Sequence, residues 1–432
     1  MPVWKPHLYR VGSSPVQLDA PPSEQEIAAH RKKIEPWLSA VLQSEHLSLF
    51  LGSGFTTAVT LLAGGKPLQM GKASFKCPAE AEVNKAADRS AEEMGRGDAN
   101  IEDQIRSALS LLAGLEILKD KRAAAWKTAL GSVLTGFATG VLTCEKEIQS
   151  SIEKSDEKGE CVKNLLVSFL LSFASRTATR ERLHIFTTNY DRLIEYGCDL
   201  VGLRSIDRFV GTLLPVFRSS RLEVDLHYNP PGIRGEPRYL EGVVKLTKLH
   251  GSVDWKYYQR QIQKTALPFG STIDAIKNPL ESLIIYPNAA KDMETLEFPY
   301  AELFRDYCGA VCRPNSVLIT YGYGFGDDHI NRVIADMLTI PSTHVVIISY
   351  DDASGRIPKF CDRVGHEAQI SLLVGKHFGD LETLVENYLP KPAIDHITRR
   401  KTNLLKDRGE GVIEDKIEEP SPSPTPPAES PI

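Results

Sequence analysis

The chain has few cysteines, and none of them forms a C-x-x-C pair. Its seven cysteines, an odd number in 432 residues, are Cys77, Cys144, Cys161, Cys198, Cys308, Cys312 and Cys361. Structural zinc sites usually draw on closely spaced cysteine pairs, and disulfide frameworks belong mainly to short secreted chains. The cysteine pattern therefore argues against both a zinc site and a disulfide scaffold.

Long apolar runs are also absent from the sequence. The longest weakly polar stretches, residues 128–143 and 165–174, are shorter than the roughly 20 residues that a membrane span requires. The first residues, Met1 to Lys5, lack the charged segment followed by an apolar segment that marks a secretory signal. We therefore expect two buried helices rather than membrane spans, and a cytoplasmic protein.

Neither sign of charge dominates the chain. The 51 Lys and Arg residues and the 56 Asp and Glu residues give a formal net charge of −5, which provides no global electrostatic reason to bind nucleic acid. We expect no direct nucleic-acid binding. The 42% hydrophobic content, which includes 8% aromatic residues, is enough to bury a large core in one enlarged domain or in two units.

The order of predicted elements favours an α/β fold with a Rossmann-like, mostly parallel sheet. Short apolar runs predict strands over residues 46–51, 183–186, 243–249, 316–320, 345–349 and 370–374. Apolar residues between these runs recur at helical spacing, for example from Ile330 to Leu338, and His329 before them is expected to be exposed. Strands that alternate with helices are typical of such a sheet.

The same patterns predict how the chain is divided. We expect an N-terminal extension over residues 1–22, one domain over 23–390 with a helical insertion over 75–180, and a disordered low-complexity tail over 391–432. Residues 203–242 are rich in Arg, Pro and Gly and poorly periodic, so they are expected to form an irregular lobe or a cover over a substrate.

A compact polar cluster follows the apolar run 183–186. It reads Thr187-Thr188-Asn189-Tyr190-Asp191. Ligands of open α/β sheets bind in the crevice at the carboxyl ends of the strands, which makes Asn189 and Asp191 candidates for chemistry. Asn and Asp are also common helix caps, so a structural role is the alternative.

Two further strand ends carry suggestive residues. Gly52-Ser53-Gly54 follows the strand 46–51 and precedes a helix, so it is either a dinucleotide phosphate cradle or simply a tight turn. His250-Gly251 follows the strand 243–249, where the imidazole either acts as a general base or satisfies buried carbonyls. Together with the polar cluster, these residues make a plausible composite site: phosphate cradle, ribose-orienting pair and base.

Four motifs in order make the sequence resemble the sirtuin-like NAD-binding family, and particularly its prokaryotic branch in antiviral defence. They are Gly52-Ser53-Gly54-Phe55-Thr56, which looks like the glycine-rich phosphate motif; Thr187-Thr188-Asn189-Tyr190-Asp191, which matches T-x-N-x-D; His250-Gly251, which matches the catalytic His-Gly; and Gly322-Tyr323-Gly324-Phe325-Gly326-Asp327, which resembles the later ligand-binding loop of that branch. The resemblance covers roughly residues 25–390.

The sequence also departs from the protein-deacylating sirtuins. Those proteins usually carry two cysteine pairs for zinc after the His-Gly motif, whereas this region holds only Cys308 and Cys312 before Cys361. Thr188 replaces a glutamine that is common in deacylases. These departures weaken the deacylase interpretation but leave NAD binding in place, and no zinc is expected.

The resemblance implies which residues form the site. On this resemblance the catalytic residues are expected to be His250 as general base toward a ribose hydroxyl or water, Asn189 as the residue that orients that water or the ribose, and Asp191 as holder of the ribose or of the Asn189 loop. The implied NAD-binding residues are Gly52, Ser53, Gly54, Phe55, Thr56, Thr188, Gly322, Tyr323, Phe325 and Asp351. For Asp351, contact with the adenosine ribose and a helix cap are equally good interpretations.

Three functions remain open at this point. The first is an NAD glycohydrolase that depletes NAD in antiviral defence, as a homo-oligomer or in complex with a separate sensor or ATPase subunit. The second is a non-catalytic module that senses NAD or an ADP-ribose derivative. The third is a protein deacylase or ADP-ribosyltransferase.

Overall fold

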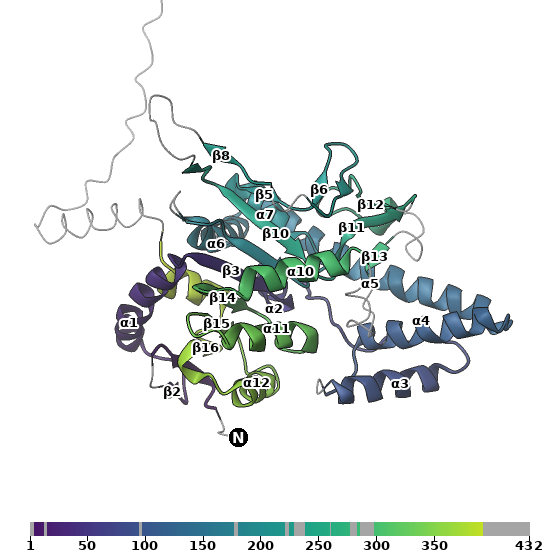
Figure 1. The fold of residues 1–432 in the computed structure, drawn as a ribbon, viewed down its shortest axis with the longest axis horizontal. Helices are drawn as coiled ribbons and strands as arrows, with labels where there is room; N and C mark the ends of the chain where they lie inside the picture. Colours follow the sequence, from purple (N-terminus) through teal and green to yellow (C-terminus); the bar gives the residue numbers. More distant parts are fainter. Residues whose placement is uncertain are drawn as a thin grey trace, which may run out of the picture. The chain divides into compact units, whose positions relative to one another are not determined.

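The computed structural model describes residues 4–12, 15–94, 97–176, 180–220, 224–228, 238–259, 261–276, 283–285 and 298–391. The chain divides into two compact units, Met1–Pro390 and Lys391–Ile432. Apart from Lys391, the predicted tail lies outside the described residues. The first unit contains all the helices and strands of the described residues (Figure 1).

A nine-stranded sheet organises this unit, in the order β2-β1-β16-β15-β14-β3-β4-β10-β5. The strands are β1 His7–Arg10, β2 Val16–Leu18, β3 His46–Leu51, β4 His184–Thr187, β5 Arg204–Ile206, β10 Val243–Lys248, β14 Ser316–Tyr321, β15 His344–Ser349 and β16 Ile370–Gly375. The strands from β16 to β5 pair in parallel, and β1 and β2 join one edge in antiparallel pairing. The predicted α/β fold with a mostly parallel sheet is confirmed.

The sequence order of the strands reverses between β3 and β14, and this point is where open α/β sheets bind ligands. The strand ends on either side of it are in register. The aligned residues, in the order β15, β14, β3, β4 and β10, are Ile348, Tyr321, Leu51, Thr187 and Lys248. The loops that carry all four sequence motifs therefore leave the sheet along one edge.

Helices cover both faces of the sheet. The longer helices are α1 Glu24–Leu42, α2 Ser53–Leu62, α3 Glu80–Glu93, α4 Ile101–Ile117, α5 Arg122–Glu153, α6 Glu157–Ala174, α7 Leu193–Val201, α10 Tyr300–Val311, α11 Asp328–Leu338 and α12 Arg356–Val364. The stretches 128–143 and 165–174 lie within α5 and α6, which carry buried residues as predicted. Among the described residues, no helix is long and apolar enough to span a bilayer.

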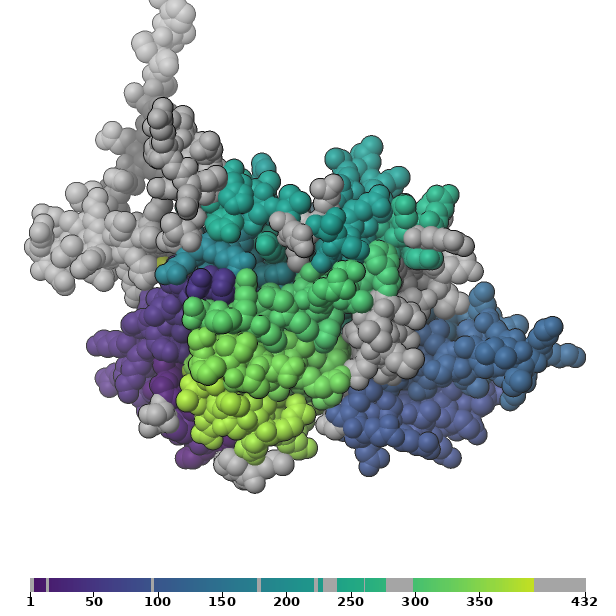
Figure 2. Space-filling model, viewed as in Figure 1, coloured from purple at the N-terminus to yellow at the C-terminus, as the bar shows by residue number. Residues whose placement is uncertain are grey.

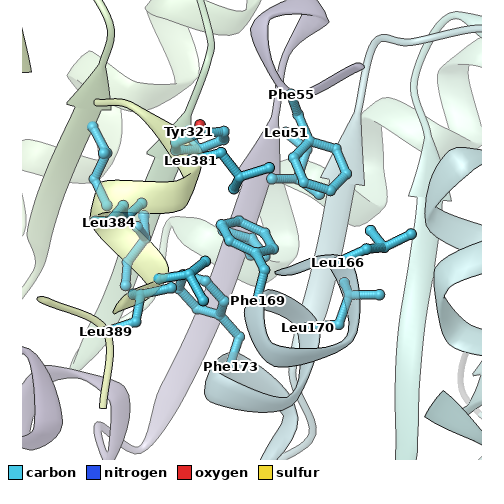
Figure 3. Packing of buried hydrophobic residues seen from close by; sticks show 14 of the residues in the cluster. Leu51, Phe55, Leu166, Phe169, Leu170, Phe173, Tyr321, Leu381, Leu384 and Leu389 are labelled. Carbon is cyan, nitrogen blue, oxygen red and sulfur yellow. The ribbon is translucent and has the colours of Figure 1, made fainter. Parts of the chain in front are cut away.

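Side chains of β3 alternate between two cores. Leu51 packs on the face covered by α1, α2, α6 and α7, where Phe55 stacks on Phe169 with ring centroids 5.0 Å apart (Figure 3). Phe50 points to the other face, which α10, α11 and α12 cover. In the space-filling view, the green to yellow residues of this part of the chain form a continuous surface (Figure 2). Because both faces are buried, the strands read as nearly continuous apolar runs.

The helical region after β3 contributes to two different cores. Helices α3 and α4 and the first part of α5 form a core of their own around Trp126, which also takes in Tyr190 from the polar cluster. Helix α6 instead packs into the core of the main sheet, beside α2 and α7. The α3–α5 segment, which we call the helical hairpin, lies beside the edge where the four motifs emerge (Figure 1).

A second, antiparallel sheet follows the order β13-β11-β12-β7-β6. Its strands are β6 Phe209–Val210, β7 Val216–Phe217, β11 Gly251–Tyr258, β12 Gln261–Lys264 and β13 Leu283–Ile285. The described part of residues 203–242 thus forms short strands: β5 in the main sheet, β6 and β7 here, and the pair β8 His227–Tyr228 with β9 Arg238–Tyr239. Strand β11 begins at Gly251, so His250 lies where the chain passes from one sheet to the other.

Candidate functional site

A cavity of about 520 Å³ opens at the aligned strand ends. Loops after five neighbouring strands and the helical hairpin line it together. The lining includes Ser53, Thr56, Thr57 and Thr60 after β3; Thr188, Asn189, Tyr190 and Asp191 after β4; His250 after β10; Tyr323, Gly324, Gly326 and Asp327 after β14; Ser354, Arg356 and Lys359 after β15; and Asp98, Asn100, Glu102, Phe137 and Val141 from the helical region. Of the thirteen predicted site residues, seven line this cavity.

Asn189 is held by a hydrogen-bond network that crosses from β4 to β3. Its amide Nδ2 donates to Gly52 O at 3.0 Å and to Thr56 Oγ1 at 3.1 Å. Its backbone N–H donates to Thr187 Oγ1 at 3.0 Å. Within the described residues no hydrogen bond engages Asn189 Oδ1. The network therefore fixes the amide plane and leaves its oxygen as an acceptor on the cavity side.

Both carboxylate oxygens of Asp191 accept hydrogen bonds from other groups of the protein. Oδ2 accepts from Thr56 Oγ1 at 2.8 Å, and Oδ1 accepts from the backbone N–H of Leu193 at 3.1 Å, at the start of α7. Lys248, buried at the end of β10, donates to the backbone oxygen of Asp191. Asp191 thus links α2 and the start of α7 to the loop of Asn189, and its predicted contact with the ribose stays a prediction.

Glu145 of α5 fastens this loop to the helical hairpin. Its carboxylate accepts from the backbone N–H of Arg192 at 2.8 Å and forms a buried ion pair with the Arg192 guanidinium. Burial raises the pKa of Glu145, and the hydrogen bonds and charge of Arg192 oppose that rise. The polar cluster is thus clamped from α2 on one side and from α5 on the other.

The predicted glycine cradle contacts another loop instead of the cavity. Gly54 N–H donates to Gly322 O at 2.9 Å, and Gly52 N–H donates to Tyr321 O at 3.0 Å. A Cβ on Gly54 would lie 2.7 Å from Gly322 Cα, and Gly322 has a φ of +63° that favours glycine. These glycines let two loops interlock at the switch point. Ser53 of the same motif does face the cavity.

Three other predicted ligand-binding residues lie away from the cavity. Phe55 is buried in the core on Phe169, and Phe325 is buried in the opposite core, 4.8 Å from the rings of Tyr323 and Phe360. Asp351 is exposed, and its carboxylate accepts from the backbone N–H of Ala353 at 2.8 Å. Helix α12 takes Gly355 as its N-cap, so Asp351 closes a turn and caps no helix.

The loop after β14 is held rigidly from α11. Tyr323 OH donates to Asn331 Oδ1 at 3.0 Å, and Asn331 Nδ2 donates to Phe325 O at 3.0 Å. Asn331 is buried, so the loop backbone and the first turn of α11 form one hydrogen-bonded unit. This unit places Tyr323 against the cavity.

His250 shares the cavity wall with a tyrosine and a carboxylate. The rings of His250 and Tyr190 lie 6.3 Å apart, and Tyr190 OH donates to Glu102 Oε1 at 2.9 Å. Burial raises the pKa of Tyr190 well above its ordinary value, and the nearby Glu102 charge adds to the rise. The phenol therefore remains protonated and acts only as a neutral hydrogen-bond donor.

The expectation that His329 is exposed was wrong. The residue is 5% exposed on the first turn of α11, and its Nε2 lies 3.3 Å from Nε2 of His250. Helix α10 covers this turn, with the Phe304 ring 5.9 Å from the His329 ring. The apolar stripe of α11 identifies its buried face but carries no information about a second helix that lies over its first turn.

The sequence prediction also missed Glu102, Arg356 and Lys359, which line the cavity. Arg356 Nε donates to Gly324 O at 2.6 Å, which ties α12 to the loop after β14. The only sequence feature that pointed to Arg356 and Lys359 was their position soon after the predicted strand 345–349. Glu102 comes from the helical hairpin, and no sequence pattern placed that segment at the site.

The dimensions and chemistry of the cavity fit a dinucleotide. Its volume lies within the range of roughly 300–1,000 Å³ that small-molecule sites occupy. The ends of β15 and β10 are separated by four strand intervals, or about 19 Å at about 4.8 Å per interval. Cations lie after β15, and an amide and an imidazole lie after β4 and β10. Among the described residues, no three His, Cys, Asp or Glu side chains are grouped to hold a metal.

Residues 183–369 match the family model described as SIR2-like domain. The match includes Asn189, His250 and the loop after β14, and it indicates NAD-related chemistry. No curated protein matches the chain. Residues 183–369 are thus similar to a SIR2-like domain, which supports a sirtuin-like family.

Proposed function

We propose that the protein is an NAD glycohydrolase that converts NAD and water to ADP-ribose and nicotinamide. The observation that carries this proposal is the position of Asn189 and His250 at neighbouring strand ends, both on the wall of one cavity. Asn189 offers an oriented amide oxygen there, and His250 offers an imidazole. These are the two groups that an attack by water on a sugar carbon needs, one to orient the water and one to take its proton.

The reaction would proceed at the ribose carbon that bears nicotinamide. The C1′–N bond breaks, its electron pair returns to the ring nitrogen, and nicotinamide leaves as a neutral molecule. Positive charge develops on the ribose and is stabilised by fixed dipoles, among which Asn189 Oδ1 is the oriented acceptor. Water oriented by Asn189 bonds to C1′ and gives its proton to His250.

The remainder of NAD would extend towards β15. Ser53 presents a hydroxyl from α2, and Arg356 and Lys359 present cations from α12. Gly54 N–H is already bonded to Gly322 O, so positive charge for the pyrophosphate comes mainly from α12 in this arrangement. Arg356 is the better placed of the two cations, because its hydrogen bond to Gly324 fixes its guanidinium beside the loop.

The family resemblance also implies a biological role for the proposed hydrolase. A hydrolase of the antiviral-defence branch would deplete NAD in the cytoplasm when triggered, as a homo-oligomer or through a separate sensor or ATPase subunit. A zinc-independent site without an acyl-lysine acceptor accords with water as the acceptor. These statements rest on the resemblance and on the cysteine pattern.

The test is a direct assay of NAD cleavage. Wild type, Asn189→Ala and His250→Ala are incubated with NAD, and nicotinamide and ADP-ribose are followed by chromatography, with NAD binding measured in parallel by calorimetry. We expect wild type to form both products in equal amounts, and both variants to bind NAD while losing turnover by roughly 100-fold or more. His366→Ala, on an exposed turn far along the chain, is the matched control.

The outcomes separate the three candidate functions. NAD binding without turnover under every condition, including addition of candidate partner subunits, would identify a sensing module instead. Product formation that requires an acylated or acceptor protein would identify a deacylase or transferase. Unchanged turnover in Asn189→Ala would contradict the role assigned to the amide.

A further inference from the structure

Two buried imidazoles meet at the cavity wall, and the roles described so far use only one of them. His250 is 7% exposed at the end of β10, and His329 is 5% exposed on α11. Their Nε2 atoms are 3.3 Å apart, and the planes of the two rings are inclined by 25°. An N···N contact of this length between imidazoles requires one ring to donate and the other to accept, so the bond holds a single proton.

His329 is fixed in place independently of His250. It follows the loop that Asn331 ties to Tyr323 and to Phe325 O, and the Phe304 ring of α10 lies against its other side. His250 instead lies at a junction between two sheets, and Gly251 after it has a φ of +87°. The rigid imidazole is thus His329, and the residue that needs orientation is His250.

Only one direction of the hydrogen bond survives proton uptake without rearrangement. If His250 Nε2–H donates to His329 Nε2, then His250 Nδ1 is the basic atom, and the imidazolium that forms keeps the same donated bond. If His329 donated, the Nε2 of His250 would already be occupied by the shared proton. A neutral His329 that accepts through Nε2 carries its own proton on Nδ1.

We propose that His329 is a positioning residue for His250: it accepts the Nε2–H bond of His250, orients that ring, and stabilises the imidazolium that forms when His250 takes the proton from water. This inference rests on the proposed function for its catalytic meaning. His329 itself touches neither NAD nor water in this scheme. Its effect on the reaction passes entirely through His250.

Several ionisable groups surround the pair and would modulate it. Tyr190 lies beside His250 from the loop after β4, with the two ring centroids 6.3 Å apart. Glu102 of α4, Asp327 of the loop after β14 and Tyr300 of α10 act electrostatically on Tyr190. Because one proton lies between two imidazoles, the pair titrates as a unit.

The first test is kinetic and uses the full-length protein. We expect His329→Ala to lower kcat for NAD cleavage by roughly 10-fold to 100-fold, the usual effect of losing a partner that orients a histidine. KM should change little, and the acidic limb of the kcat–pH profile should shift. His329→Gln should recover most of kcat, because its amide oxygen can accept the Nε2–H bond. His344→Ala, a histidine at the opposite end of β15 that bonds Ser371, should retain wild-type kinetics.

Two kinetic results would overturn the proposal. One is a fully active His329→Ala. The other is an equal loss in His329→Gln and His329→Ala when both unfold at the wild-type urea midpoint, because a hydrogen-bond acceptor would then be insufficient.

The second test needs no turnover. In one-bond ¹H–¹⁵N spectra of protein labelled with ¹⁵N-histidine, the shared Nε2 proton of His250 should be protected from exchange and visible in wild type. Its signal, assigned by its loss in His250→Gln, should vanish in His329→Ala and persist in His329→Gln and His344→Ala. A persistent signal in His329→Ala would refute the pairing even if NAD is cleaved. A signal that behaves as expected in a protein that does not cleave NAD would leave the pairing intact and refute the proposed hydrolase.

Discussion

At the scale of single residues, Thr56 connects the two side chains that the polar cluster contributes. Its hydroxyl donates to Asp191 Oδ2 at 2.8 Å and accepts from Asn189 Nδ2 at 3.1 Å. Asn189 is therefore oriented from α2 as well as from its own strand. The motif Gly52 to Thr56 was predicted to hold phosphate. In the structure its last residue, Thr56, bonds Asn189 and Asp191.

Thr56→Val should separate orientation from binding. The substitution keeps the size of the side chain but removes the hydroxyl, so the amide of Asn189 loses one anchor. Since a misplacement of about 1 Å can cost roughly 100-fold in rate, we expect kcat for NAD cleavage to fall by roughly 10-fold to 100-fold with NAD affinity nearly retained. Thr56→Ser keeps the hydroxyl and should stay close to wild type. Equal kinetics for the Val and Ser variants would show that Asn189 needs no support from Thr56.

At the scale of elements, the interlocked loops after β3 and β14 join the two halves of the sheet. Gly54 and Gly322 allow this because a side chain on either would collide with backbone: a Cβ on Gly322 would lie 2.6 Å from Phe55 N. Such contact cannot be relieved by a rotamer change. The glycines thus shape the site by permitting close approach, although neither lines the cavity.

Gly54→Ala should destabilise the protein by about 1–3 kcal/mol, the usual cost of overpacking. The reason is that the loops must separate to admit the methyl group, which would also move Ser53 and Thr56. Gly309→Ala is the matched control, because a Cβ at that helical position has no neighbour within 4 Å, and we expect it to be neutral or stabilising by up to about 1 kcal/mol. Urea unfolding of both variants measures the difference. Equal stabilities would mean that the loop contact is not tight in solution.

Helices and strands could be predicted from the sequence where the spacing of apolar residues marks the buried face. They were much harder to place where burial depends on a segment that is distant in the sequence. The strand ends that carry Asn189 and His250 followed from apolar runs that stop at polar residues, and the parallel register brings them together. The pattern could not show that α10 covers His329 or that α4 delivers Glu102, because helical periodicity identifies an apolar face without naming its partner. It also could not distinguish a glycine that meets a ligand from one that meets another loop.

At the scale of the whole unit, the residues that line the cavity come from widely separated parts of the sequence. The match to the SIR2-like domain begins at residue 183, yet Ser53 and Thr56 of α2 and Glu102 of the helical hairpin line the same cavity. Integrity of the sheet across all these segments is therefore a condition for the site. Conditions that weaken the sheet should weaken the site with it.

Acid should be such a condition, because buried histidines lie within the sheet. His184 on β4 is buried, and its Nε2 lies 2.8 Å from Thr247 Oγ1. Burial, together with nearby Lys245, lowers the pKa of His184 well below the ordinary 6.5. Burial also lowers the pKa of His344 on β15. These imidazoles stay neutral in the folded state, whereas the unfolded chain takes up protons as the pH falls through 6.5.

The contribution of these histidines to the free energy of unfolding should therefore be fully present above about pH 6.5. At lower pH the free energy of unfolding should decrease, by up to about 1.4 kcal/mol per pH unit for each such histidine. His184→Gln retains a polar side chain that can bond Thr247 but removes the titration, so its stability should decline less steeply between pH 6.5 and 5. His366→Gln, on an exposed turn, should keep the wild-type slope. Urea unfolding at several pH values compares the slopes directly. A His184→Gln slope parallel to wild type would show that this histidine does not resist protonation in the folded state, and the acid sensitivity would then have to come from other groups, such as His344.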